Sequence, residues 1–165
     1  MMEYSFSESV VAVLLAEAFP EEPVPQKEAL VPAEYLDLAE AKRWLLDGLG
    51  YTEVLSTLGG RSWRQITANE VCHHVRALER LSDSAFSYYV PAWCLWSARD
   101  QQVRECVVDT VVALLEYAPA SLWNDVQRQA ICAWLFLVDK WNREGWQLCL
   151  LGQAVERAIK RLRAP

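Results

Sequence analysis

The run Ala85–Trp96 constrains the fold of this chain more than any other segment. Apart from Ser87 and the hydroxyls of two tyrosines, its twelve residues carry no polar side chain. A helix that is apolar on every side has to be surrounded by protein or lipid, and so short a run cannot cross a bilayer. We therefore predict that Phe86–Trp96 is a buried central helix, kinked at Pro91 because proline lacks the amide that would bond the carbonyl of Ser87.

The rest of the chain carries helical patterns, and its 165 residues fit one domain. We predict an all-α fold, a single compact domain over 1–165 with six to eight helices around the central one. The other expected helices cover 7–19, 33–47, 52–58, 67–81, 101–117, 123–141 and a last stretch from about residue 145. Valines in 107–112 leave a strand open as the alternative for 101–117. Four prolines make 20–32 an extended connecting segment.

Capping residues precede three of these helices. Ser7 or Ser9 can cap the first helix, and Ser82 is a candidate cap of the central one. Thr67 and Glu70 have the spacing of a capping box, in which each side chain bonds the backbone amide of the other. These residues therefore predict where the helices begin.

The charge of the chain is distributed unevenly. The net charge is −6, and residues 1–53 carry −8 while 54–165 carry +2. An acidic front of this kind argues against direct nucleic-acid binding, which needs basic groups to neutralise phosphates. It is compatible with a basic protein partner attracted over a distance, or with a solvated surface that aids solubility.

Cysteine usage and the first residues bear on the compartment. The five cysteines are odd in number, form no Cys-x-x-Cys pair and lie in apolar helical patterns, which favours a reducing compartment. The apolar stretch 10–16 resembles a secretory signal but follows acidic rather than basic residues. We therefore expect a cytoplasmic protein that is not inserted in a membrane.

Catalytic and metal-binding patterns are absent from the sequence. The two histidines, His73 and His74, are adjacent and would point about 100° apart on a helix, so they make a poor metal pair. Glu70 lies four residues before His74 and is expected to pair with it. No nucleotide-binding glycine motif or serine-nucleophile motif occurs. We predict no catalytic residue, no metal and no cofactor, which favours a non-enzymatic role while leaving an enzyme open.

Candidate binding residues follow the Gly59-Gly60 turn. Arg61, Trp63 and Arg64 are of the residue types that most often anchor interfaces. In the alternative interpretation, Trp63 packs into the core and both arginines are solvated. Tyr88 and Tyr89 lie on different faces of the central helix, so we expect at most one hydroxyl to reach a useful polar partner.

Four segments together give the chain a family resemblance. They are Ala18-Phe19-Pro20, Gly60-Arg61-Ser62-Trp63, the motif Leu-Ser-x-x-Ala-Phe-x-Tyr-Tyr-x-Pro-Ala at 81–92, and Gln-x-x-Ala-Ile-x-x-Trp-Leu at 127–135. Over residues 10–137 the chain resembles an uncharacterised bacterial family of small helical proteins, and it departs from the pattern after Asp139. The resemblance implies an architecture rather than a mechanism, and by analogy a place among bacterial toxin-immunity and defence proteins.

Three functions follow as hypotheses. The first is a non-enzymatic protein-binding module, an immunity or inhibitor protein of a bacterial toxin or defence system. The second is a small ligand-binding protein or enzyme with a pocket beside the Phe86–Trp96 helix, lined by Trp63, Tyr88 or Tyr89, Trp93 and His74, with Arg61 holding an anion. The third is a structural subunit that makes its contact through exposed Trp141 and Trp146. The oligomeric state stays open in all three.

Overall fold

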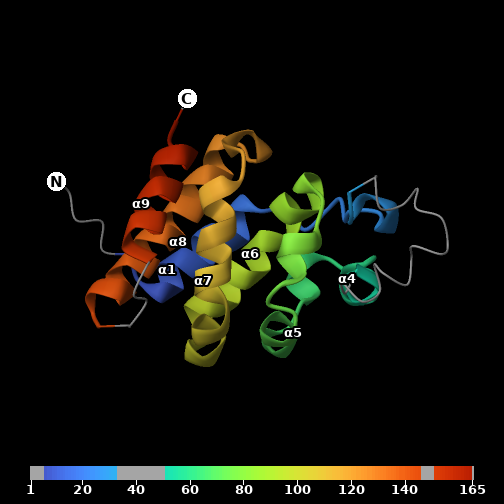
Figure 1. The fold of residues 1–165 in the computed structure, drawn as a ribbon, viewed down its shortest axis with the longest axis horizontal. Helices are drawn as coiled ribbons and strands as arrows, with labels where there is room; N and C mark the ends of the chain where they lie inside the picture. Colours follow the sequence, from blue (N-terminus) through green and yellow to red (C-terminus); the bar gives the residue numbers. More distant parts are fainter. Residues whose placement is uncertain (1–5, 33–50, 146–150, 165) are drawn as a thin grey trace.

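The computed structural model describes residues 6–32, 51–145 and 151–164, and every regular element in these ranges is helical (Figure 1). The expected helix 33–47, Cys149 and Trp146 lie outside the described residues. The α-helices are α1 (Glu8–Ala18), α4 (Tyr51–Leu58), α5 (Ala68–His73), α6 (Asp83–Arg99), α7 (Gln101–Tyr117), α8 (Asp125–Arg143) and α9 (Leu151–Leu162). Short 3-10 helices are η1 (Lys27–Ala29), η2 (Trp63–Gln65), η3 (Ala77–Arg80) and η4 (Ala120–Leu122). The all-α prediction is confirmed.

Helix α6 is the central element of the fold, as predicted. It packs against α1, α7 and α8 and also contacts α5 and three of the 3-10 helices. Trp93, Cys94 and Ala92 are fully buried, and Ser87, Tyr88 and Trp96 are the residues of the Ala85–Trp96 run that keep partial exposure. Neighbouring helices therefore cover the apolar surface on all sides.

Pro91 lies inside α6, which continues through it from Asp83 to Arg99. The missing amide of Pro91 leaves the carbonyl of Ser87 without its helical donor. The indole Nε1 of Trp123, just before α8, donates to that carbonyl at 3.3 Å. A side chain from another element thus replaces the hydrogen bond that proline removes.

Most helix boundaries follow the caps read from the sequence. Ser7 caps α1, Ser82 caps α6, and the capping box of Thr67 and Glu70 starts α5. Helix α7 forms where a strand was the alternative, and Asp100 accepts hydrogen bonds from the amides of its first turn. The helical interpretation of 101–117 is therefore confirmed.

The predicted helix 67–81 is wrong in its second half. Helix α5 ends at His73, the backbone leaves helical geometry at His74, and the chain resumes as the 3-10 helix η3. This arrangement still buries Leu78, at 2% exposure, next to α6. The apolar spacing predicted which side chains are buried. It did not predict the backbone conformation, which depends on packing against α6.

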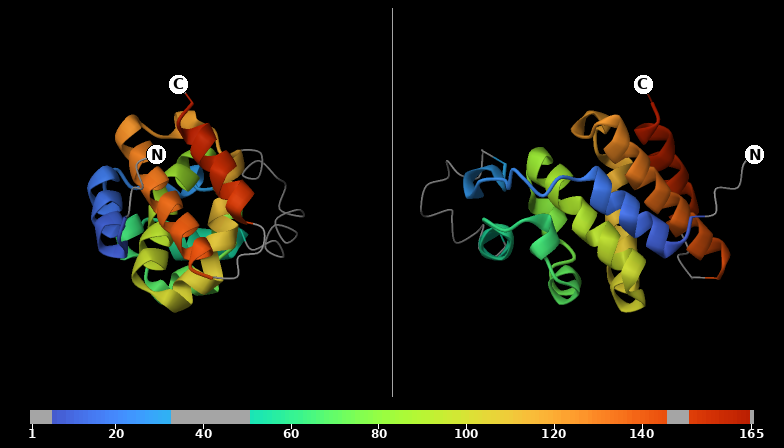
Figure 2. Two further views of the ribbon diagram at one scale, coloured as in Figure 1. Left: turned by 90° about the vertical axis from the view of Figure 1, so that its left-hand side faces the viewer. Right: turned by 180° about the vertical axis from the view of Figure 1, so that it is seen from behind.

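One end of the molecule is built from α1, α8 and α9. Both α1 and α9 pack along α8, and the reverse view shows α1 crossing beside α6 and α8 (Figure 2). Trp141 of α8 is 3% exposed and its indole donates to Glu8 of α1 at 3.0 Å, so the expected exposure of this tryptophan is wrong. No helix in the described ranges is long and apolar enough to cross a membrane.

Candidate functional site

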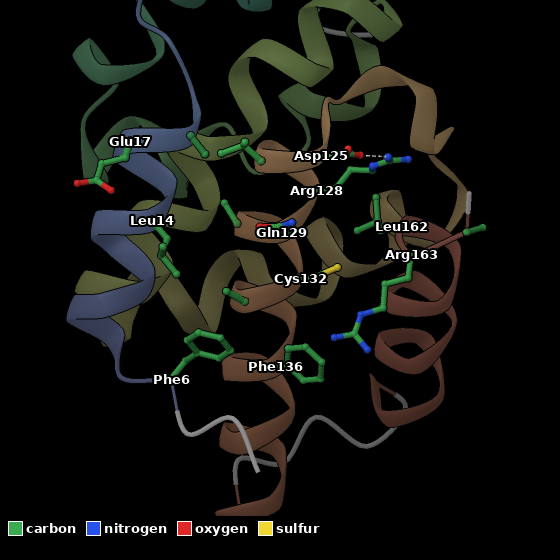
Figure 3. Close-up of a pocket in the computed structure, with 15 residues that line it drawn as sticks. Phe6, Leu14, Glu17, Asp125, Arg128, Gln129, Cys132, Phe136, Leu162 and Arg163 are labelled. Atoms are coloured by element: carbon green, nitrogen blue, oxygen red, sulfur yellow. Dashed lines mark hydrogen bonds and ion pairs between the residues drawn. The ribbon is translucent and has the colours of Figure 1, made fainter. Parts of the chain in front are cut away.

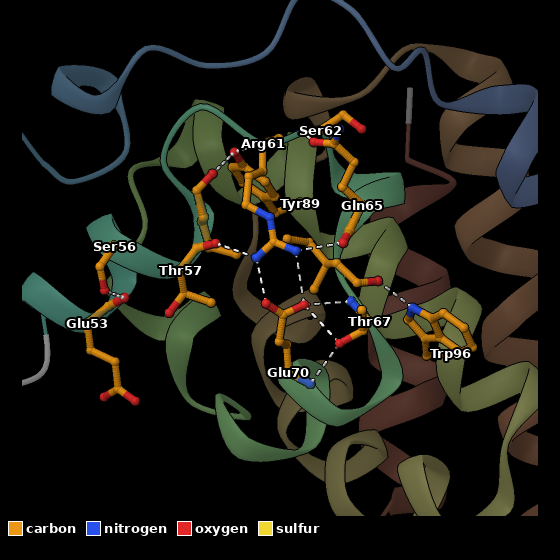
Figure 4. Close-up of polar contacts among 12 residues, drawn as sticks. Glu53, Ser56, Thr57, Arg61, Ser62, Gln65, Thr67, Glu70, Tyr89 and Trp96 are labelled. Carbon is orange, nitrogen blue, oxygen red and sulfur yellow. Dashed lines mark hydrogen bonds and ion pairs between the residues drawn. The ribbon is translucent and has the colours of Figure 1, made fainter.

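The turn after Gly60 is organised by Arg61, whose guanidinium makes four polar contacts (Figure 4). Nη1 donates to the carbonyl of Thr57 at 2.9 Å and Nη2 to that of Gln65 at 2.7 Å. The two nitrogens also reach the carboxylate oxygens of Glu70 at 2.5 and 3.1 Å. Because an internal carboxylate already pairs with Arg61, the geometry gives no support to the anion-holding role expected for it.

Glu70 owes its electrostatic state to these contacts. The hydrogen bond from Arg61 lowers the pKa of Glu70 to about 2, and hydrogen bonds from the amide and hydroxyl of Thr67 act in the same direction. The expected pairing of Glu70 with His74 is wrong. His74 Nδ1 instead lies 2.8 Å from a carboxylate oxygen of Glu53, on α4. The Arg61–Glu70 pair therefore joins α4, η2 and α5.

Trp63 and Tyr88 bond the backbone of the proline segment, and Arg64 bonds that of α1. Trp63 is 1% exposed and its indole donates to the carbonyl of Pro20 at 3.1 Å. The guanidinium of Arg64 lies over the Trp63 ring at 5.2 Å and donates to a backbone carbonyl of α1. The hydroxyl of Tyr88 donates to the carbonyl of Glu21. Trp63 thus packs into the core, as the alternative interpretation expected.

Tyr89 and Trp93 are fully buried in the core. The Tyr89 hydroxyl lies 2.8 Å from the carbonyl oxygens of both Leu58 and Arg61, and burial raises the pKa of this phenol. Both tyrosine hydroxyls therefore reach polar partners, and the expectation of at most one is wrong. Trp93 Nε1 has no hydrogen-bond partner among the described residues. Of the residues expected around the central helix, Tyr88 does line a cavity, of about 360 Å³, together with the proline segment. Most of the predicted residues therefore lie in the packed region where α6 meets the proline segment and the turn after α4.

Another cavity lies elsewhere, an open groove of about 630 Å³. Helix α8 forms its floor, and α1 and α9 form its two walls (Figure 3). We call it the α8 groove. Its apolar lining includes Phe6, Leu14, Ala130, Ala133, Phe136 and Leu162. Its size and lining are those of a binding cleft.

Charged side chains stand at the rim of the α8 groove. Arg128 and Asp125 pair with each other at one end. On the α9 wall the Arg163 guanidinium lies over the Phe136 ring at 5.0 Å, and Glu17 stands on the α1 wall (Figure 3). The two walls therefore carry charges of opposite sign above a floor that is apolar apart from Gln129.

Sequence reasoning missed the α8 groove because its floor looks like core. Ala130 and Ala133 are each 3% exposed, and Cys132 is buried enough for desolvation to raise its thiol pKa. One signal was present in α1, whose apolar residues go all round the helix. Val10 and Val13 remain 47% and 54% exposed. In the sequence, that stretch predicts the first helix and resembles a secretory signal.

Comparisons with protein-family models, curated proteins and solved structures found no match. Within the described ranges, no group of three or more His, Cys, Asp or Glu side chains is placed to hold a metal ion. The function is therefore argued from the α8 groove itself.

Proposed function

We propose that this chain is a non-enzymatic protein-binding module, and that the α8 groove is where its partner docks. The observation that carries the proposal is the open apolar groove between α1 and α9. A concave, mostly apolar cleft of this volume is typical of binding sites. Val10 and Val13 of α1, the helix that forms one wall, are also exposed.

The side chains at the groove suit binding better than catalysis. Arg128 is paired with Asp125, and burial raises the pKa of the Cys132 thiol, which makes it a poor nucleophile. The other polar cluster, Arg61 with Glu70, is saturated by its own contacts. A binding role needs none of these groups to change its protonation state.

The finer proposal is an immunity or inhibitor protein that neutralises a partner by occluding it, in a bacterial toxin or defence system. The resemblance of 81–92 and the neighbouring motifs to a bacterial family supports it. The free thiols of Cys72, Cys94, Cys106 and Cys132 support a reducing compartment such as the cytoplasm.

The acidic front supports a basic partner less strongly than its charge suggests. Glu8 accepts from Trp141, and Glu21 accepts from Ser62. Glu53 contacts His74. Because these carboxylates are engaged within the chain, we place the docking surface at the α8 groove, to which residues 1–53 contribute only Phe6 and the α1 wall.

The test is co-purification of the full chain with the product of each adjacent gene. We expect a stable complex that suppresses the partner's activity. Val126→Arg, at a groove-lining position 61% exposed, should weaken it, whereas Tyr117→Arg, at a position 72% exposed on α7, should not. If neither product binds and deletion of the gene leaves growth unaffected in competition, the proposal fails.

A further inference from the structure

The α8 groove has the shape of a helical bundle that lacks one helix. Among the described residues, α1 and α9 each pack extensively along α8 and make at most marginal contact with each other. Two helices that flank a third in this way leave a position where a fourth helix could contact all of them. The close-up shows α8 between α1 and α9, with the groove-lining Leu14, Phe136 and Leu162 drawn on these three helices (Figure 3).

Small residues on the floor and walls make this position suitable for a helix. Ala130 and Ala133 on α8, with Ala18 on α1, line the groove with little more than methyl groups. Such positions form the holes into which side chains of a neighbouring helix insert. The lining of α8 extends from Asp125 to Phe136, which corresponds to about 17 Å of helix, or roughly three turns.

The charges at the rim favour one kind of helix. Arg163 presents a cation from the α9 wall, and on the opposite wall Glu17 disfavours a second acid. Arg128 is already neutralised by Asp125. A partner with a carboxylate on the side facing Arg163 therefore complements the groove.

Resting on the proposed function, we infer that the partner segment is an amphipathic α-helix of about three turns. It lies along α8 with its apolar stripe on the floor and a carboxylate against Arg163. A membrane surface fits less well, because the apolar floor is concave and an acidic residue stands at its rim. A second copy of this chain would have to offer an acidic amphipathic helix of its own.

The experiment uses two synthetic peptides of fourteen residues with the same leucine stripe. One carries glutamates along one flank, the other carries glutamines there, and the opposite flank is glutamine in both. Affinities for the full chain are measured by calorimetry with wild-type protein and with Arg163→Met, which keeps an apolar stem over Phe136. Arg76→Met, at an exposed position between α5 and η3, is the matched control.

We expect the glutamate peptide to bind wild-type protein about tenfold more tightly than the glutamine peptide. That preference should vanish in Arg163→Met and persist in Arg76→Met. Hydrogen exchange on wild-type protein should show protection in α1, α8 and α9 when the peptide is bound. This measurement needs no variant to fold.

Four results would overturn the inference. The first is that Arg163→Met prefers the glutamate peptide as strongly as wild-type protein does, and the second is that hydrogen-exchange protection appears outside the groove. The third is that the chain binds anionic lipid vesicles and not the peptides, and the fourth is that the chain self-associates in a way that Val126→Arg abolishes. If an adjacent gene's product binds and protects the groove while neither peptide binds, the inference fails and the proposed function stands. If the peptides bind as expected but no gene product binds, the immunity role fails and the groove assignment stands.

Discussion

The contact between Trp123 and Ser87 predicts that Pro91 and Trp123 are energetically coupled. Proline at position 91 deprives the Ser87 carbonyl of its helical donor, and the Trp123 indole supplies a substitute at 3.3 Å. In Pro91→Ala, the restored amide can donate to Ser87 within α6. Trp123→Phe should therefore cost less stability in the Pro91→Ala background than in the wild type.

The magnitude follows from what each substitution removes. Trp123 is 4% exposed, so Trp123→Phe loses apolar volume in both backgrounds, at about 1–2 kcal/mol. In the wild-type background it also leaves a partly buried carbonyl without a donor, which adds about 1 kcal/mol. The volume loss cancels in the double-mutant cycle, and so does the effect of proline on the unfolded chain. The expected coupling energy is about 1 kcal/mol.

The assay is urea unfolding of the four proteins, with free energies compared at a shared slope. Trp141→Phe is the control, because that indole donates to Glu8 rather than to α6, and its cost should be the same with and without Pro91→Ala. If Trp123→Phe costs the same in both backgrounds, within about 0.3 kcal/mol, the indole does not replace the lost helical bond and the reasoning is refuted.

Three further predictions concern other polar groups. Arg61 holds the pKa of Glu70 at about 2, so the pair stabilises the fold above pH 4.5 and loses this effect as the pH falls towards 2. In urea unfolding, Glu70→Gln should therefore lower the free energy of unfolding by about 1–2 kcal/mol at pH 7 and by almost nothing near pH 2. An equal loss at both pH values would contradict this. Trp134→Phe should lower the free energy of unfolding by about 1 kcal/mol more than Trp93→Phe does. Both indoles are fully buried, but among the described residues only Trp134 Nε1 has a hydrogen-bond partner, the Ser97 hydroxyl at 2.9 Å. Equal losses in chemical unfolding would argue against that bond. Burial and the neighbouring Cys106 raise the pKa of the Cys72 thiol to about 11. Iodoacetamide at pH 8 should therefore alkylate the exposed Cys106 well before Cys72, as followed by peptide mass spectrometry. Equal alkylation rates would contradict the burial of Cys72.

Local chemistry explains why much of the fold could be predicted from the sequence. A cap such as Ser7 or Ser82 bonds an amide about three residues away, so its signal is contained in a few neighbouring letters. The change from α5 to η3 near His74 has no such signal, since it arises from packing against α6. Short-range hydrogen bonds were therefore predictable where tertiary adjustments of the backbone were not.

The contacts of the predicted site residues could not be predicted from the sequence either. Arg61, Trp63 and Tyr88 were selected for their side-chain chemistry, and each does make specific polar contacts. Several of their acceptors are backbone carbonyls, such as that of Pro20, 43 residues from Trp63. Every residue has a carbonyl, so the sequence carries no mark of which one a distant indole or hydroxyl will reach. The residue types indicated specific contacts but could not distinguish an internal partner from an external one.

Helices α1 and α6 show what would have located the α8 groove. Both are apolar on nearly every side, which by itself predicts burial on every side. Packing satisfies this for α6, whereas Val10 and Val13 of α1 stay about half exposed because α1 lies at the edge of the fold. An all-round apolar helix at an edge implies a neighbour that the described residues do not supply. Together with the uncovered side of α8, that deficit argues that binding occurs at the α1–α8–α9 end of the molecule rather than at the Arg61 turn.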